Sequence, residues 1–269
     1  MKPIRVGIAG LGAIGRAIAQ KLHQGAVPQA ELTGIAVRDR AKAQAFLDEI
    51  GSTVPIHSVE ELAKVADLVV ECAPAMAFSE IASPVLSAGK MFMALSVGQL
   101  LERPELIALA KEHGGQIIVP TGALIGLDAV TAAAEGQIHS VSMITRKPVK
   151  GLLGAPYLAK HGIDIANITA PLRIFQGSAR EAARGFPENV NVVAALSLAG
   201  IGPDRTTIEI WADPALTRNV HRVVVESDSA SFEMSIQNIP SENPKTGRIT
   251  ALSALAALRK LRAPLSVGT

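Results

Sequence analysis

A glycine-rich turn between a buried strand and a helix is the feature that most constrains how this chain can fold. Residues 10–15 read Gly-Leu-Gly-Ala-Ile-Gly; an apolar run over residues 4–9 precedes them and helical spacing over residues 13–22 follows. Glycines at these positions permit the tight turn, the approach of a pyrophosphate, and close packing of helix on strand. The helix N-terminus adds free N–H groups and a partial positive charge. The pattern therefore predicts that Gly10, Gly12, Ala13, Ile14 and Gly15 cradle a dinucleotide, with a ligand-free glycine turn as the alternative.

The segment around this turn alternates short apolar runs with helical spacing. Strands are predicted at residues 4–9, 32–37, 67–71, 91–96 and 116–119, and helices at residues 13–22, 41–50, 78–88 and 104–113. Near-continuously apolar strands separated by helices are typical of a parallel sheet that is covered on both faces. The predicted fold class is therefore α/β, with an N-terminal Rossmann doubly wound parallel sheet.

The pattern changes after about Thr121. Residues 205–212, 222–226 and 231–239 alternate polar and apolar side chains, as strands with one buried face do. Residues 248–261 have the spacing of an amphipathic helix. We expect a dinucleotide-binding domain at residues 1–121 and a second, mixed α/β domain with a largely antiparallel sheet at residues 122–244. The segment 245–269 is expected to pack back on the first domain.

Composition excludes several classes of partner. The net charge is only +2 and aromatic residues make up 3% of the 269 residues, so neither electrostatics nor base stacking supports nucleic-acid binding. No apolar run reaches the roughly 18 residues of a membrane span. A single cysteine, Cys72, excludes a disulfide framework and a thiolate metal site, and no metal is expected. We expect a cytoplasmic protein that acts on a small molecule.

The residues after the second predicted strand bear on the choice of dinucleotide. An acid at this point favours NAD because it accepts a hydrogen bond from the ribose 2′-hydroxyl, whereas arginine accommodates the 2′-phosphate of NADP. The sequence here is Val37-Arg38-Asp39-Arg40. Because Arg38 and Asp39 favour different cofactors, the sequence predicts NAD or NADP without choosing between them.

Further candidates lie where other predicted strands end. Cys72 and Ala73 follow the strand at residues 67–71, and Ala123 follows the strand at residues 116–119, at the carboxyl edge where open α/β sheets bind ligands. Cys72 has no visible partner and is interpreted as a small buried residue rather than a nucleophile. His221 lies in a polar turn leading into a strand, where a general acid or base is plausible, although a surface histidine is almost as plausible.

Other polar residues have both structural and binding interpretations. Asn189 and Asn191 precede an apolar run, so Asn189 either caps a helix or presents its amide to a ligand. Arg146 and Lys147 end a predicted strand and either bind an anion or are solvated.

These motifs together resemble the L-aspartate dehydrogenase family. The resemblance covers essentially the whole chain and is carried by the glycine turn and by five later segments, namely residues 119–126, 145–148, 186–191, 219–221 and 241–247. It implies NAD- or NADP-dependent oxidation of L-aspartate to iminoaspartate, which hydrolyses to oxaloacetate and ammonia or feeds NAD biosynthesis. It also implies His221 as the catalytic histidine, dinucleotide contacts at Ala123 and at Asn189 or Asn191, and a homodimer or higher homo-oligomer.

A dicarboxylate substrate needs cationic or N–H groups to hold it. Arg146, Lys147, Lys245 and Thr246 are the candidates for this role. Two alternative functions remain open. One is a related oxidoreductase resembling homoserine dehydrogenase or dihydrodipicolinate reductase, and the other is a nicotinamide-binding sensor without turnover.

Overall fold

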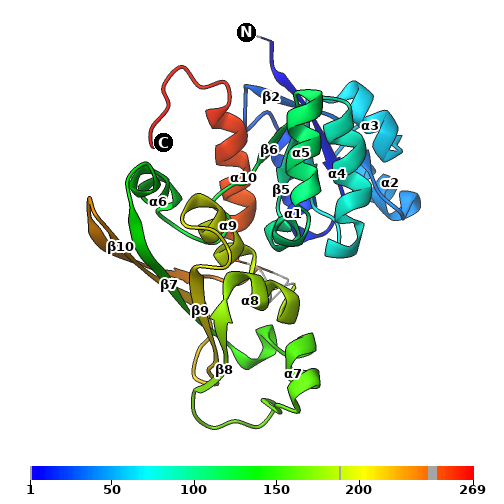
Figure 1. Ribbon diagram of the computed structural model, residues 1–269. Coiled ribbons are helices and arrows are strands. Elements are labelled where there is room, and N and C mark those ends of the chain that lie inside the picture. The colour runs from blue at the N-terminus through cyan, green and yellow to red at the C-terminus, as the bar shows by residue number, and fades with distance from the viewer. Residues whose placement is uncertain (1, 188, 242–246) are drawn as a thin grey trace. The chain divides into compact units, whose positions relative to one another are not determined.

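The computed structural model describes residues 2–187, 189–241 and 247–269 (Figure 1). The chain divides into two compact units. The first comprises residues 1–96, 103–120 and 251–266, and the second comprises residues 97–102, 121–250 and 267–269. Within the described ranges, no helix combines the length and apolar character needed to cross a membrane.

The first unit is built on a six-stranded sheet in the order β3-β2-β1-β4-β5-β6, and every neighbouring pair is parallel. Its elements are β1 (Ile4–Ala9), α1 (Ala13–His23), β2 (Ala30–Ala36), α2 (Arg40–Glu49), β3 (Ile56–His57), α3 (Val59–Val65), β4 (Leu68–Glu71), the 3₁₀ helix η1 (Ala75–Ala77), α4 (Phe78–Ser87), β5 (Met91–Ala94), α5 (Pro104–His113), β6 (Gln116–Ile118) and most of α10 (Ile249–Lys260). The strand order reverses beside β1, where β2 lies on one side and β4 on the other. The predicted doubly wound parallel sheet is confirmed.

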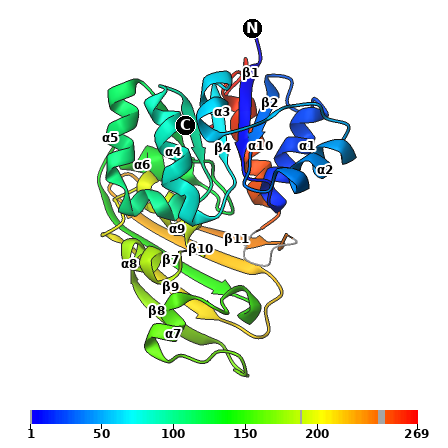
Figure 2. The same ribbon diagram turned by 90° about the vertical axis from the view of Figure 1, so that its right-hand side faces the viewer.

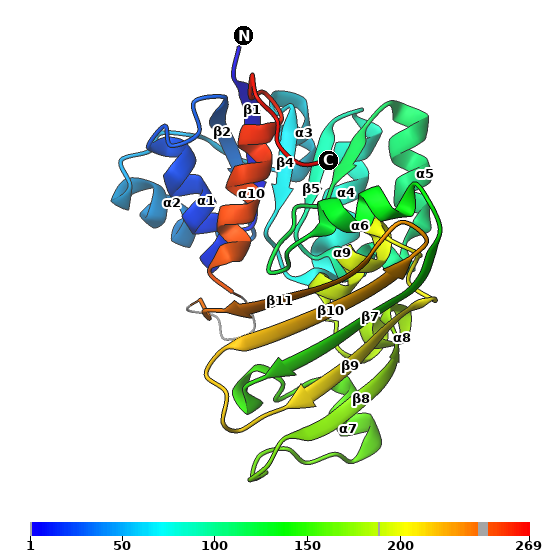
Figure 3. The same cartoon turned by 90° about the vertical axis from the view of Figure 1, so that its left-hand side faces the viewer.

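Helices cover both faces of this sheet (Figure 3). One face packs with α1, α2 and α10 in a single apolar cluster that joins Ile8 of β1 to Ile18 of α1 and Leu258 of α10. Helices α3, α4 and α5 lie on the other face, where Phe78 of α4 meets Phe92 of β5 edge to face at 5.3 Å between ring centroids. Because both faces are covered, these strands are apolar along nearly their whole length.

The sequence interpretation missed β3 and α3. The strand β3 has only two residues at the edge of the sheet, which is too short for a periodic pattern. Helix α3 does carry a sequence signal. The Ser58 hydroxyl accepts a hydrogen bond from the Glu61 N–H, and the Glu61 carboxylate accepts one from the Ser58 N–H. This capping box is readable as Ser-x-x-Glu in the sequence.

The second unit contains a five-stranded sheet in the order β11-β10-β7-β9-β8 (Figure 3). Only β7 and β9 pair in parallel, and the other neighbours are antiparallel, which confirms a mixed, largely antiparallel sheet. Its elements are the 3₁₀ helix η2 (Val97–Glu102), α6 (Leu127–Ala134), β7 (Ile138–Lys147), the 3₁₀ helix η3 (Val149–Gly151), α7 (Pro156–His161), β8 (Leu172–Ser178), α8 (Ala179–Gly185), α9 (Asn191–Ala199), β9 (Thr206–Ala212), β10 (Asn219–Ser227) and β11 (Ser231–Asn238).

Helices cover one face of the second sheet (Figure 2). Helices α8 and α9 pack against β9, and α6 packs on α9. The covered face is apolar along most of β7 and β10, with Val141, Met143, Val223 and Val225 almost fully buried. At one end of the same strands the buried side chains become polar, and this end holds the candidate residues of the second unit.

The segment 97–102 belongs to the second unit, although the sequence analysis placed it in the first. The Gly98 N–H donates to Asn191 Oδ1 at 3.1 Å, the Arg180 guanidinium donates to the Leu101 carbonyl, and Arg184 Nε donates to Glu102 at 3.0 Å. Because of these contacts with α8 and α9, the segment packs with the second unit, although it follows β5 in the chain. A local sequence pattern does not report such long-range contacts.

Candidate active site

The glycine turn has no room for side chains at two of its three glycines. Gly10 has φ +100°, and a Cβ there would lie 2.6 Å from the Cys72 carbonyl oxygen. A Cβ on Gly15 would lie 2.1 Å from the Gly10 carbonyl oxygen. A Cβ on Gly12 would meet no described protein atom closer than 3.9 Å, so packing does not exclude a side chain there. Gly12 is the N-cap of α1 and provides no side-chain cap, which leaves the first N–H groups of the helix available to an anion.

A cavity of about 390 Å³ lies beside this turn, in the first unit. Four of the predicted residues line it, namely Gly10, Arg38, Asp39 and Ala73. The other predicted residues of this unit, Gly12, Ala13, Ile14, Gly15 and Cys72, do not line it. The size and the lining suit the adenosine half of a dinucleotide, and the crowded glycine turn leaves backbone N–H groups for its phosphates. The residues present therefore fit a dinucleotide.

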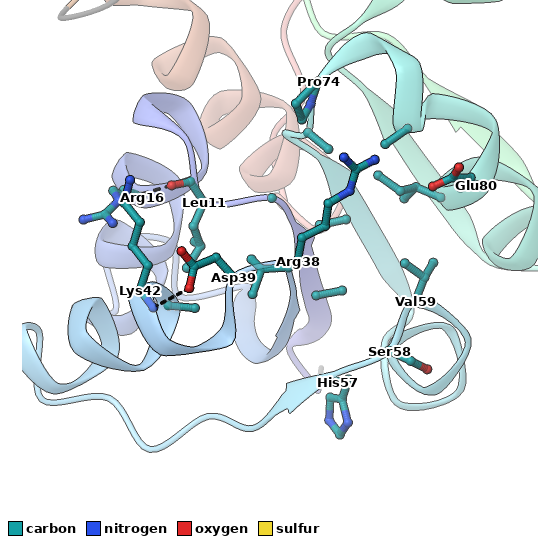
Figure 4. Close-up of a pocket in the computed structure, with 18 residues that line it drawn as sticks. Leu11, Arg16, Arg38, Asp39, Lys42, His57, Ser58, Val59, Pro74 and Glu80 are labelled. Atoms are coloured by element: carbon teal, nitrogen blue, oxygen red, sulfur yellow. Dashed lines mark hydrogen bonds between the residues drawn. The ribbon is translucent and has the colours of Figure 1, made fainter.

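Cations predominate among the charged residues of this cavity. Arg16, Arg38 and Lys42 line it together with Asp39 and Glu80. In Figure 4, Arg38 reaches across toward Pro74 and Glu80, whereas the other cations lie on the side of the glycine turn. Among the described residues, none forms a hydrogen bond or ion pair with the Arg38 guanidinium, which is exposed.

The carboxylate of Asp39 is already engaged. It caps α2 by accepting a hydrogen bond from the Lys42 backbone N–H at 2.9 Å. The residue that follows the last residue of β2 is Val37, which has no polar side-chain atom for a ribose hydroxyl. The helix cap is therefore one structural role of the acid that the sequence pattern associated with NAD.

Glu71 is a buried residue that the sequence interpretation missed. This last residue of β4 is 0% exposed, and its carboxylate accepts four hydrogen bonds. The donors are the backbone N–H groups of Ala73, Leu95 and Ser96, at 3.2, 3.2 and 2.8 Å, and the Ser96 hydroxyl at 3.0 Å. Burial raises the pKa of Glu71, and the four donors oppose that rise by stabilising the ionised form. The carboxylate thereby connects the segment after β5 to Ala73 through hydrogen bonds, and the backbone of Ala73 packs closely on Gly10.

Cys72 lies beside this carboxylate. Burial and the charge of Glu71 together raise the pKa of the Cys72 thiol well above its ordinary range. The protonated thiol is a poor nucleophile, which agrees with the expectation that Cys72 is not a nucleophile. The residue is half-buried rather than buried.

The polar end of the second sheet places His221 inside a strand rather than in the loop that the sequence suggested. His221 is the third residue of β10 and pairs in register with Thr145 of β7. Its Nδ1 lies 3.2 Å from the Thr145 hydroxyl oxygen, and the imidazole is 2% exposed. Burial, and next the charge of Lys147, lower the pKa of His221 from 6.5 to about 3. The ring is therefore neutral at physiological pH.

Lys147 and Asn189 form the other part of this polar end. Lys147 is 3% exposed, and its ammonium donates to the backbone carbonyl of Asn189 at 3.0 Å and to Asn189 Oδ1 at 3.1 Å. Asn189 does not cap α9, because the N-cap residue is Val190. Two predicted site residues are thus in direct contact, and Lys147 lies close enough to His221 to influence its pKa.

The remaining candidates have other surroundings or are not described. Arg146 alternates with Lys147 along β7 and so lies on the opposite face, where its guanidinium covers the Trp211 ring at 4.9 Å and lies 3.8 Å from Asp213. Asn191 accepts the Gly98 N–H, which is a structural role. The Ala123 carbonyl accepts a hydrogen bond from Asn238 Nδ2 at 2.8 Å. The predicted Lys245 and Thr246 lie outside the described residues.

Both parts of the chain are similar to known dehydrogenases. Two family profiles match: "Aspartate dehydrogenase, C-terminal" at residues 128–261 and "Homoserine dehydrogenase, NAD binding domain" at residues 10–120. An L-aspartate dehydrogenase of Bradyrhizobium diazoefficiens is 58% identical over 99% of this chain and 94% of its own length. An L-aspartate dehydrogenase 3 of Bordetella bronchiseptica is 56% identical, covering 98% and 97%. The crystal structure of an aspartate dehydrogenase from Thermotoga maritima has the same fold, with a TM-score of 0.71, 24% identity and coverage of 98% and 99%.

The buried, neutral state of His221 predicts a specific contribution to acid unfolding. Between pH 6.5 and about 3 the unfolded chain binds a proton at this residue that the folded chain does not bind. The free energy of unfolding should therefore fall with falling pH, by up to about 1.4 kcal/mol per pH unit from this group. In His221→Gln, urea unfolding across this pH range should show a correspondingly shallower slope.

The matched control is His139→Gln, which changes an exposed histidine on β7 of the same sheet. Its slope should equal that of the unchanged protein. A slope in His221→Gln that also equals that of the unchanged protein would contradict the assignment of a neutral, buried imidazole.

Proposed function

The chain belongs to the L-aspartate dehydrogenase family, and from this premise we propose that it oxidises L-aspartate with NAD or NADP as the acceptor. The products are iminoaspartate, the reduced dinucleotide and a proton, and water converts the imine to oxaloacetate and ammonia. The observation that carries the proposal is the 58% identity with an L-aspartate dehydrogenase over 99% of this chain. The cavity beside the glycine turn supports the dinucleotide requirement independently.

The bound dinucleotide supplies the hydride acceptor at its nicotinamide ring. The chain must supply a proton acceptor, because the substrate ammonium loses protons as the carbon–nitrogen double bond forms. His221 is the candidate for this role, because a neutral imidazole has a lone pair that can accept a proton. If Nδ1 carries the ring proton and donates it to the Thr145 hydroxyl, the lone pair of Nε2 is left for the substrate. In that tautomer the Thr145 hydroxyl oxygen is the acceptor of the Nδ1 proton.

The substrate carboxylates require cationic or N–H partners. Lys147 supports this role because it is a buried cation that also influences His221. Asn189 orients the Lys147 ammonium through two hydrogen bonds. Lys245 and Thr246 remain candidates for the same role on the strength of the sequence. Arg146 is a weaker candidate, since it lies on the other face of β7.

The cavity of the first unit supports use of both cofactors. Asp39 is engaged as the cap of α2, and Arg38 lines the cavity with a guanidinium that bonds to no described residue. We therefore assign recognition of a 2′-phosphate to Arg38. The proposal also includes a cytoplasmic location, assembly as a homo-oligomer and a place in NAD biosynthesis. The family resemblance supports these three points.

The direct test of the function is a substrate panel. Purified protein with NAD or NADP should form reduced dinucleotide with L-aspartate, measured by its absorbance. L-Homoserine and other amino acids should give little signal. Homoserine is included because the first unit matches a homoserine dehydrogenase profile. Preferential oxidation of homoserine, or dinucleotide binding without turnover of any amino acid, would replace this proposal with one of the two alternatives.

The companion variant in this panel is His221→Ala. Loss of a general base should lower turnover of L-aspartate by about 10²- to 10⁴-fold and leave dinucleotide binding nearly intact, because His221 and the dinucleotide cavity belong to different units. Near-normal turnover by a folded His221→Ala protein would remove His221 from the mechanism.

Cofactor choice should depend on Arg38. Arg38→Ala should lower kcat/KM for NADP relative to that for NAD by about 10- to 100-fold, the range expected for one hydrogen bond to a charged group. Arg40→Ala is the matched control, since Arg40 donates to the Ile56 carbonyl and does not line the cavity. Its ratio should not change. An equal loss with NAD and NADP in Arg38→Ala would show that Arg38 does not recognise the 2′-phosphate.

A further inference from the structure

A buried amide oxygen near His221 has no partner in the described part of the chain. Asn219 is the first residue of β10 and is 3% exposed. Its Oδ1 is buried, and no described group donates a hydrogen bond to it. Most buried polar atoms of folded proteins are hydrogen-bonded, because an unpaired acceptor loses its water without replacement. Such an atom at a strand end is therefore a candidate for ligand contact.

The position of Asn219 links this oxygen to the candidate site. Side chains alternate along β10, so Asn219 and His221 occupy the same face of the strand. Lys147 and Asn219 each lie one residue beyond the cross-strand pair of Arg146 and Val220. The amide of Asn219 is therefore part of the same buried polar end as the imidazole and the Lys147 ammonium.

The neighbouring polar groups are already engaged with other partners. Asn238, which pairs with Asn219 on β11, donates its amide N–H to the Ala123 carbonyl at 2.8 Å. The Lys147 ammonium donates twice to Asn189. The Thr145 hydroxyl lies against His221. These neighbouring groups therefore bond to partners other than Asn219. A hydrogen bond to Asn219 Oδ1 has to come from a donor outside the described chain.

The other buried atoms without partners lie elsewhere. They are the hydroxyl oxygens of Ser52 and Thr206 and the side-chain oxygen of Gln29, and none belongs to this polar end. Gln29 immediately precedes β2, at the edge of the first sheet opposite to the glycine turn. Asn219 therefore differs from these three by its place beside a buried, neutral histidine.

We propose that Asn219 Oδ1 binds the α-ammonium group of the amino-acid substrate. This inference rests on the proposed function and adds to it the residue that recognises the amine. An amide oxygen accepts hydrogen bonds from an ammonium and has no proton to offer a carboxylate. The neutral imidazole of His221, two residues away on the same face, is the second acceptor. The two acceptors hold the ammonium between them, and His221 receives the proton that leaves it.

The test compares two ligands that differ by the amine. L-Aspartate and succinate share both carboxylates, and succinate has hydrogen in place of the ammonium. Binding of each is measured by calorimetry to the full chain saturated with reduced dinucleotide, which cannot accept a hydride. In Asn219→Ala, the affinity for L-aspartate should fall by about 10- to 100-fold, as expected for one hydrogen bond to a charged group, and the affinity for succinate should not change.

Two further variants separate recognition from a general packing effect. Val220→Ala truncates the adjacent residue on the opposite face of β10 and should leave both affinities unchanged. Asn219→Asp keeps an acceptor oxygen and should retain the preference for L-aspartate over succinate. Unchanged affinity for the dinucleotide in each variant shows that the first unit remains folded.

Three outcomes would overturn the inference. They are an equal loss of L-aspartate and succinate binding in Asn219→Ala, no loss of either, and a selective loss of succinate binding. The first would mean that the amide presents its N–H₂ group to a carboxylate, since both ligands carry the same two carboxylates. Failure of the proposed function is distinguishable, because the unchanged protein would then fail to oxidise L-aspartate in the substrate panel.

Discussion

The first unit depends on the close approach of three backbone segments at the glycine turn. The Gly10 carbonyl lies so near Gly15, and the Cys72 carbonyl so near Gly10, that neither glycine can carry a Cβ. This contact brings the start of α1 against the ends of β1 and β4, where the strand order reverses. The buried Glu71 carboxylate adds the segment after β5 to the same junction through four hydrogen bonds. The dinucleotide cavity is the space beside this junction.

The second unit differs from the first in that it buries polar side chains at one end of an apolar sheet face. Burial there keeps His221 neutral, and cross-strand pairing with β7 supplies a hydroxyl for its Nδ1. Lys147 keeps its buried charge by donating to Asn189. One face thus holds a neutral base, a paired cation and an amide oxygen that has no partner among the described residues. We propose that these groups complement an amino acid with a carboxylate and an ammonium.

Local sequence patterns predicted much of the fold, and they predicted the site less completely. The strand at residues 4–9 and the helix at residues 104–113 were predicted with the bounds that the structure has, since their apolar runs and their glycine and proline boundaries are local signals. Several features of the site were not predicted. They are the role of Asp39 as a helix cap, the placement of Arg146 and Lys147 on opposite faces of β7, and the burial of Glu71 and Asn219. The burial of Glu71 and Asn219 depends on packing between distant segments, which composition and periodicity do not report. The Asp39 cap and the alternation along residues 146–147 are local features that were missed.

The central claim is that this chain removes a hydride from the α-carbon of L-aspartate and delivers it to a nicotinamide dinucleotide. The most direct measurement uses L-aspartate deuterated at the α-carbon and follows the label by NMR. We predict one deuterium at C4 of the nicotinamide ring of each reduced dinucleotide formed, with oxaloacetate and ammonia released in equal amounts. Reduced dinucleotide without deuterium, or oxaloacetate formed without reduction of the dinucleotide, would contradict it.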